Sequence, residues 1–111
     1  MKQVWIIGTG GPEKLQLREA PELQPQAGEL RIRVSASGIN FADILARKGL
    51  YPDAPKLPAV VGYEVSGTVD AVGPQVDNAW IGKAVFALTR FGGYADTVVV
   101  PETQAFEKPA E

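Results

Sequence analysis

The sequence predicts a mainly β domain, a barrel or sandwich that carries one short α-helix. Three observations support this fold class. The 111 residues correspond to one domain of ordinary size. Several short runs alternate apolar and polar residues with the period of a β-strand. The 12 Gly and 9 Pro residues are spread along the chain, where they separate these runs as turns.

The clearest strand begins at Glu29, because the aliphatic residues at 30, 32 and 34 share one face and two arginines share the other. The segment 15–19 alternates in the same way and is expected to be a half-buried strand. Glycines within 63–73 indicate a long strand that bends or approaches another backbone closely. The predicted strands are 4–7, 15–19, 29 onward, 63–73, 83–88, 94–100 and 104–108.

Residues 40–49 change to the spacing of a helix. Asn40 is a good N-cap residue, and Asp43 can return the capping-box hydrogen bond. Asp43 is also expected to pair with Arg47 at i,i+4. Gly49 suits the position that follows the last helical turn. Three prolines at 52, 55 and 58 then predict a rigid loop.

The composition excludes several classes of chemistry. The chain has no Cys and no His, which excludes disulfides, thiolate nucleophiles, iron–sulfur clusters, a Ser-His-Asp triad and the usual zinc sites. A net charge of -2 gives no reason to expect nucleic acid or an anionic membrane as a partner. No apolar run approaches the ~20 residues of a membrane span, and the first residues do not form a signal peptide. We therefore expect a cytoplasmic protein.

A glycine-rich turn at 8–11 imitates the dinucleotide-binding fingerprint G-x-G-x-x-G. The third glycine of that fingerprint would stand at position 13, which is Glu13. Pro12 is also followed by a strand pattern, whereas the fingerprint requires a helix. The turn is therefore predicted to join two strands of a hairpin.

A set of motifs in a fixed order connects the chain to a family. These motifs are SGINFAD (37–43), GLYP (49–52), PAVVGYEVSGTV (58–69), GKAVF (82–86) and GGYAD (92–96). Together they resemble the catalytic, GroES-like domain of the medium-chain dehydrogenase/reductase superfamily. The resemblance covers essentially residues 1–111 and implies a GroES-like, partly open β-barrel with one short α-helix. It also implies that the nucleotide-binding Rossmann domain of the family is absent from this chain.

Two positions place the chain within that superfamily. Zinc alcohol dehydrogenases carry a Cys where this chain has Asn40 and a His where it has Tyr63, together with a four-cysteine lobe for which there is no counterpart here. The resemblance therefore implies the zinc-independent branch, with the quinone oxidoreductases and the relatives of synaptic vesicle membrane protein VAT-1. In that branch NADPH delivers a hydride to a quinone or an activated enone or enal.

The resemblance also implies a site. Asn40 is expected to lie near the nicotinamide and the substrate, Tyr51 to line the same cleft, and Tyr63 to form a further wall. An amide and a phenol can donate hydrogen bonds to the negative charge that develops on a substrate oxygen. Each residue has a plainer alternative: Asn40 as a helix cap, Tyr51 as an anchor of the proline loop, and Tyr63 as a packed aromatic.

Three charged residues receive weaker assignments. Asp43 and Glu64 are expected to be structural, and Arg90 is either a contact for cofactor phosphate or substrate or a solvated loop residue. The domain alone is expected to be inactive and to bind NADPH poorly, while the full-length protein is expected to dimerise. The alternative function is a non-catalytic GroES-like interaction module, because the same fold serves as a chaperonin lid.

Overall fold

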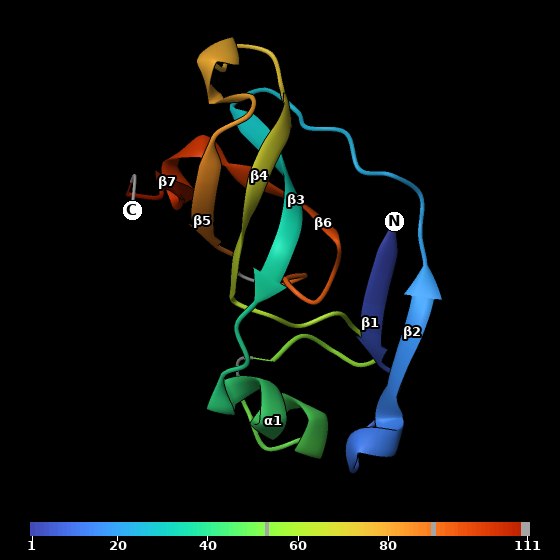
Figure 1. The fold of residues 1–111 in the computed structure, drawn as a ribbon. Helices are drawn as coiled ribbons and strands as arrows, with labels where there is room; N and C mark the ends of the chain where they lie inside the picture. Colours follow the sequence, from blue (N-terminus) through green and yellow to red (C-terminus); the bar gives the residue numbers. More distant parts are fainter. Residues whose placement is uncertain (53, 90, 110–111) are drawn as a thin grey trace.

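The computed structural model describes residues 1–52, 54–89 and 91–109. Its strands and its helix follow one another along the chain as Figure 1 shows. They are β1 (Lys2–Ile6), β2 (Leu15–Glu19), β3 (Glu29–Ser37), α1 (Phe41–Lys48), β4 (Glu64–Val72), β5 (Ala84–Leu88), β6 (Thr97–Pro101) and β7 (Ala105–Glu107). Each predicted strand is present, with bounds that differ by a few residues.

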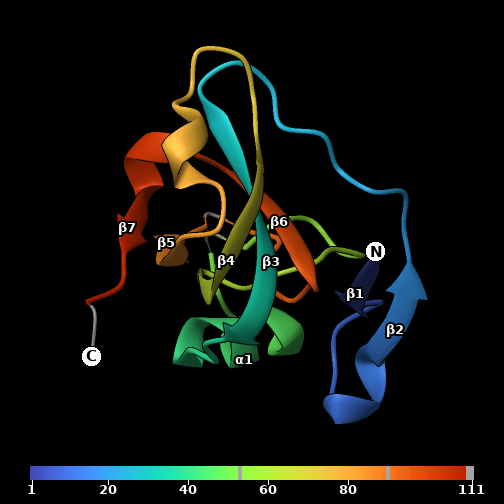
Figure 2. The same cartoon turned by 45° about the horizontal axis from the view of Figure 1, so that its top comes forward.

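Five of the strands form one antiparallel sheet in the order β6-β3-β4-β5-β7, and β1 pairs with β2 in a separate ribbon. The register of β3 against β4 shifts twice, between Arg31 and Ile32 and between Val34 and Ala36. Such irregularities increase the local twist of a sheet. The sheet curls accordingly, with α1 lying across the end to which β3 runs (Figures 1 and 2). This confirms the predicted mainly β, GroES-like, partly open barrel.

The inner face of the curled sheet holds the larger of two apolar clusters. Leu30 and Ile32 of β3 are both 0% exposed, as the alternation in the sequence predicted. Gly67 of β4 lies directly against the backbone of Arg33, so a side chain there would collide with β3. The buried members of this cluster are Leu30, Ile32, Val65, Val69, Val85, Ala87, Val98, Val100 and Ala105.

The burial predicted for β2 is wrong. The strand has the predicted bounds, but all five of its residues are exposed, and the side chain of Leu17 is 66% exposed. Among the described strands β2 pairs with β1 alone, from Lys2 opposite Glu19 to Ile6 opposite Leu15. An alternating pattern predicts a strand, but it does not show whether another layer of the fold covers that strand.

Helix α1 begins and ends as predicted. Asn40 has the extended backbone of an N-cap residue, and its N–H donates to Asp43 Oδ2 at 3.0 Å. Gly49 ends the helix in the left-handed conformation with φ 78°. The expected Asp43–Arg47 ion pair is not among the contacts of the described residues. Arg47 Nε donates instead to the carbonyl of Gly10 at 3.1 Å, and the Gly10 N–H donates to the Arg47 carbonyl at 2.9 Å.

The second apolar cluster joins α1 to the β1–β2 ribbon. Its buried residues are Ile6 of β1, Ala46 of α1 and Val61 of the loop before β4, with Tyr51 and Tyr94 packed against them. Ile6 also pairs through its backbone with residue 59 of that loop. The helix is therefore held by segments that are far apart in the sequence.

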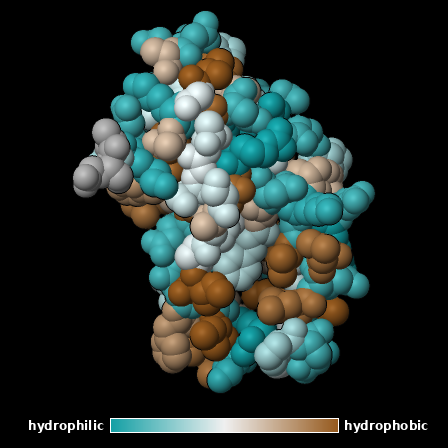
Figure 3. Space-filling view, in the orientation of Figure 1, coloured by the Kyte–Doolittle hydropathy of each residue, from teal (hydrophilic) through white to brown (hydrophobic). Residues whose placement is uncertain are grey.

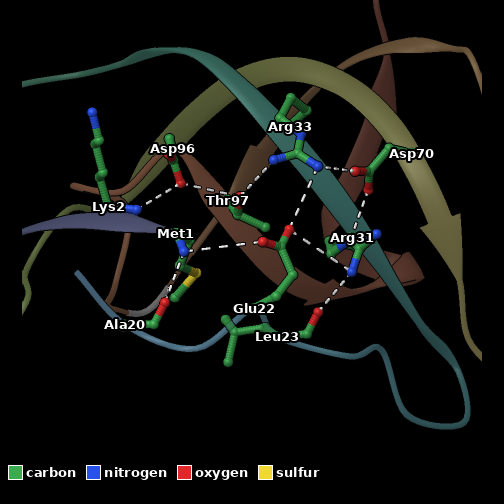
Figure 4. A network of polar contacts seen from close by, with 10 residues as sticks. All are labelled: Met1, Lys2, Ala20, Glu22, Leu23, Arg31, Arg33, Asp70, Asp96 and Thr97. Carbon is green, nitrogen blue, oxygen red and sulfur yellow. Dashed lines mark hydrogen bonds and ion pairs between the residues drawn. The ribbon is translucent and has the colours of Figure 1, made fainter.

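The opposite end of the β1–β2 ribbon is attached to the sheet by charged groups (Figure 4). Asp70 of β4 accepts from Arg31 Nε at 2.8 Å and from an Arg33 guanidinium nitrogen at 2.9 Å. The carboxylate of Glu22, in the segment after β2, lies 3.5 Å from the Arg33 guanidinium. The hydrogen bond to Asp70 is the main reason that the pKa of Arg31 is raised. This network attaches the ribbon to β3 and β4.

Candidate functional site

The first predicted site residue, Asn40, stands at the N-terminus of α1 between two exposed apolar residues. The side chain of Ile39 is 76% exposed and that of Phe41 is 72% exposed, the highest values among the large apolar residues described. Figure 3 shows apolar side chains gathered over α1 and the adjoining end of the β1–β2 ribbon. Large exposed apolar patches are typical of binding surfaces. Asn40 is thus a polar group within an apolar surface.

The second and third predicted residues are in contact with each other. The rings of Tyr51 and Tyr63 meet edge to face, with centroids 6.3 Å apart. Tyr63 meets Phe91 in a similar way at 5.9 Å. Tyr51 follows α1, Tyr63 precedes β4 and Phe91 precedes β6, so three loops contribute one ring each. Edge-to-face pairs of this type add about 1 kcal/mol beyond the area they bury.

The structure brings two of the three predicted site residues into contact with each other. Tyr51 and Tyr63 form the aromatic cluster, whereas the polar contacts of Asn40 are with Asp43 of its own helix. Tyr51 also packs against the apolar cluster of Ile6 and Val61, which agrees with its alternative role as an anchor of the loop. Arg90 lies outside the described residues.

A polar contact that the sequence did not predict lies beneath α1. Tyr94 donates its hydroxyl to Asp43 Oδ2 at 2.8 Å. Asp43 is 3% exposed, and among the described residues its Oδ1 has no hydrogen-bond partner. Burial, followed by this hydrogen bond to Asp43, raises the pKa of the Tyr94 phenol. The one signal in the sequence was the occurrence of a tyrosine in the GGYAD motif, which did not indicate its partner.

Two hollows border the β1–β2 ribbon. The larger, of about 500 Å³, lies between the ribbon and β3, and the smaller, of about 220 Å³, lies between the ribbon and α1. Ile39 and Tyr94 line both of them. The smaller is lined by Ile6, Leu15, Ile39, Asp43, Ile44, Arg47 and Tyr94. Asn40, Tyr51 and Tyr63 line neither of these two hollows.

The described residues contain no group of three or more acidic side chains that could hold a metal ion, and the sequence has no Cys or His to add to one. No helix in the described part of the chain is both long enough and apolar enough to cross a membrane.

This curled sheet, with one capped helix at its end, is the fold of a known family. The chain belongs to the alcohol dehydrogenase GroES-like domain family, which it matches over residues 26–110. Its relatives include quinone oxidoreductases and VAT-1 proteins of the medium-chain dehydrogenase/reductase superfamily, as its motifs predicted.

Particular relatives show how far the similarity extends. The chain is 39% identical over 109 residues to the synaptic vesicle membrane protein VAT-1 homolog-like of Homo sapiens, a match that covers 98% of this chain and 26% of that protein. It is 38% identical over 109 residues to the quinone oxidoreductase of Pseudomonas aeruginosa, covering 97% of this chain and 33% of the enzyme. The chain therefore spans between a quarter and a third of the length of these relatives.

Solved structures agree with the sequence matches. The human VAT-1 homolog-like protein superimposes with a TM-score of 0.93 at 39% identity, covering 99% of this chain and 35% of that one. The Escherichia coli quinone oxidoreductase complexed with NADPH gives a TM-score of 0.90 at 33% identity, covering 99% and 34%.

Proposed function

We propose that residues 1–111 form the substrate-side GroES-like domain of a zinc-independent, NADPH-dependent quinone or enone oxidoreductase. The observation that carries the proposal is the Asn40 amide within the exposed apolar surface of Ile39 and Phe41. The similarity to quinone oxidoreductases, one of them complexed with NADPH, supports the reaction class. In zinc alcohol dehydrogenases the position of Asn40 is a metal ligand, and an amide is not such a ligand.

The residues of this chain suit the nicotinamide end of NADPH and not its phosphates. The glycine-rich turn does not suit the phosphates, because the Gly11 N–H already donates to the Glu13 carboxylate at 3.2 Å and that negative charge would repel a phosphate. The nicotinamide end requires a hydrogen-bonding group beside an apolar wall, which Asn40 with Ile39 and Phe41 would provide. The phosphates are accordingly assigned to a nucleotide-binding domain outside residues 1–111, and these residues alone are expected to be inactive.

When bound, NADPH supplies a hydride, which together with one proton reduces the acceptor by two electrons. The Asn40 amide and the Tyr51 hydroxyl then donate hydrogen bonds to the substrate oxygen on which negative charge develops. Tyr63 positions Tyr51 through their edge-to-face contact and forms a wall for a planar substrate. Preorganised donors can stabilise such charge without a Lewis acid. The whole protein is proposed to be a cytoplasmic homodimer.

The test is NADPH oxidation by the full-length protein with a quinone, followed at the nicotinamide absorbance. Asn40→Ala removes both the cap and the donor, whereas Asn40→Asp keeps a capping oxygen but replaces the NH₂ donor with a negatively charged oxygen. We expect both variants to lower kcat by about a hundredfold, the usual loss of one such donor. Asn78→Ala, an exposed asparagine remote from the site, is the matched control. Normal turnover in a folded Asn40→Asp protein would leave Asn40 as a helix cap only.

Absence of any NADPH oxidation by the wild-type protein, across quinones and enones, would favour the alternative, a non-catalytic interaction module.

A further inference from the structure

Tyr94 reaches from the connection between β5 and β6 to the first turn of α1. Its hydroxyl donates to Asp43 Oδ2 at 2.8 Å, and the same oxygen accepts the backbone N–H of Asn40 at 3.0 Å. The Asp43 N–H donates in turn to the Asn40 carbonyl at 3.0 Å. One carboxylate oxygen therefore joins a residue 51 positions away in the sequence to the N-cap of α1.

The Asp43 carboxylate depends on these two donors. It is 3% exposed, and its Oδ1 has no hydrogen-bond partner among the described residues. A buried carboxylate is stable only where hydrogen bonds replace the water it has lost. Loss of the Tyr94 hydroxyl would leave Oδ2 with the Asn40 N–H alone. The carboxylate would then turn toward solvent and release Asn40.

Tyr94 is well suited to act as a permanent donor. Burial and the hydrogen bond to Asp43 raise the pKa of its phenol, which therefore keeps its proton further into the alkaline range than an ordinary tyrosine. Its ring packs against the cluster of Ile6 and Val61, and its backbone N–H donates to the Val61 carbonyl at 2.9 Å. The neighbouring loop is held by Ser37, whose hydroxyl donates to the Gly93 carbonyl at 2.6 Å. The ring and backbone of Tyr94 are thus held by contacts additional to its hydrogen bond with Asp43.

We infer that Tyr94 and Asp43 are positioning residues, which hold Asn40 at the N-terminus of α1 in the orientation that its amide needs to meet a substrate oxygen. This inference rests on the proposed function for the role of the Asn40 amide. The hydrogen-bonded chain from Tyr94 through Asp43 to Asn40 can be tested without it.

The first measurement is hydrogen exchange of the Asn40 backbone amide by NMR in the full chain. Tyr94→Phe removes one oxygen and keeps the packed ring, so the fold is expected to persist. We expect the Asn40 amide to exchange about threefold to tenfold faster, as the loss of one hydrogen bond predicts. Ser37→Ala is the matched control, because it removes a hydroxyl that holds the same loop without touching Asp43. Unchanged Asn40 exchange in Tyr94→Phe, or equal acceleration in Ser37→Ala, would overturn the inference.

If Tyr94→Phe does not fold, Asp43→Asn tests the same hydrogen bond by changing its acceptor. The neutral amide removes the charged acceptor, so the pKa of Tyr94 is expected to fall, while burial still keeps it above the ordinary value. A double-mutant cycle of the two changes should show coupling at the Asn40 amide. Additive effects there would show that the two side chains act independently.

The second measurement is turnover in the full-length protein. Tyr94→Phe is expected to lower kcat about tenfold while the KM for NADPH changes less than about twofold, because a slightly misplaced donor affects the reaction more than binding. Faster Asn40 exchange with unchanged kcat would overturn the positioning role. Absence of activity in the wild-type protein would contradict the proposed function instead. The exchange rate of the Asn40 amide would then still test whether Tyr94 and Asp43 hold Asn40 in place.

Discussion

The two apolar clusters of this domain are built in different ways. The larger cluster has nine buried residues, all but one from the paired strands β3 to β6, so that hydrogen-bonded neighbours in the sheet are also neighbours in the core. The smaller has three buried residues, Ile6, Ala46 and Val61, drawn from a strand, a helix and a loop. Polar contacts complete the smaller one, namely Arg47 with Gly10 and Asp43 with Tyr94. The sheet region is stabilised chiefly by burial, and the candidate site rests on the region where side-chain hydrogen bonds matter more.

The largest expected effect is on the sheet. Ile32→Ala removes a side chain that is 0% exposed at the centre of β3. We expect it to lower the free energy of unfolding by about 4 kcal/mol, because the paired strands cannot collapse into the cavity. Denaturant unfolding at constant m-value measures this loss.

Ile6→Ala, in the smaller cluster, is the matched comparison. Its loops can close around the missing atoms more easily, so a cost of about 2 kcal/mol is expected. Equal costs at the two positions would show that the two clusters are equally rigid.

A smaller effect is expected at the contact between α1 and the β1–η1 turn, where η1 is the short 3₁₀ turn Pro12–Lys14. Arg47→Met keeps much of the side-chain length but removes the hydrogen bond to the Gly10 carbonyl, worth about 1 kcal/mol. The Gly10 amide, which donates to the Arg47 carbonyl, should then exchange about threefold to fivefold faster by NMR. Arg18→Met, on the exposed ribbon, is the control and should leave Gly10 exchange unchanged.

The smallest effect concerns alkaline pH. The pKa of Tyr94 is raised in the folded chain above the ordinary value of 10.0, chiefly by burial and then by Asp43. The unfolded chain therefore releases this proton first, so the contribution of Tyr94 is complete below pH 10 and is lost as the pH rises further. Urea unfolding between pH 8 and 11 should show a shallower decline for Tyr94→Phe than for the wild type. Parallel curves would mean that the phenol has the same pKa in both states.

The features predicted correctly from the sequence are those that local patterns encode. The alternation around Leu30 and Ile32 predicts burial because neighbouring side chains of a strand point to opposite faces. Asn40, Asp43 and Gly49 predict the ends of α1 because caps act within a few residues. The ordered motifs predict the family, since they extend over the whole chain.

The remaining features depend on contacts between distant residues. The exposure of Leu17 follows from the absence of a described layer over β2, which no pattern within 15–19 could reveal. Arg47 was within reach of Asp43 by helical spacing, but the turn at Gly10 offered it a backbone carbonyl instead. The bond from Tyr94 to Asp43 spans 51 positions and has no local signature. The sequence thus predicts the ends of α1 better than it predicts the long-range contacts that hold the helix.

The two tryptophans of the chain are divided between these regions. Trp80 packs against the larger cluster, with the Lys83 ammonium 5.4 Å from its ring, whereas Trp5 lies in β1 beneath the Arg18 guanidinium at 5.3 Å. Each region therefore contains its own natural fluorophore, next to a cation. Single tryptophan-to-phenylalanine variants would turn one protein into two optical probes, one for the sheet and one for the ribbon that supports the candidate site.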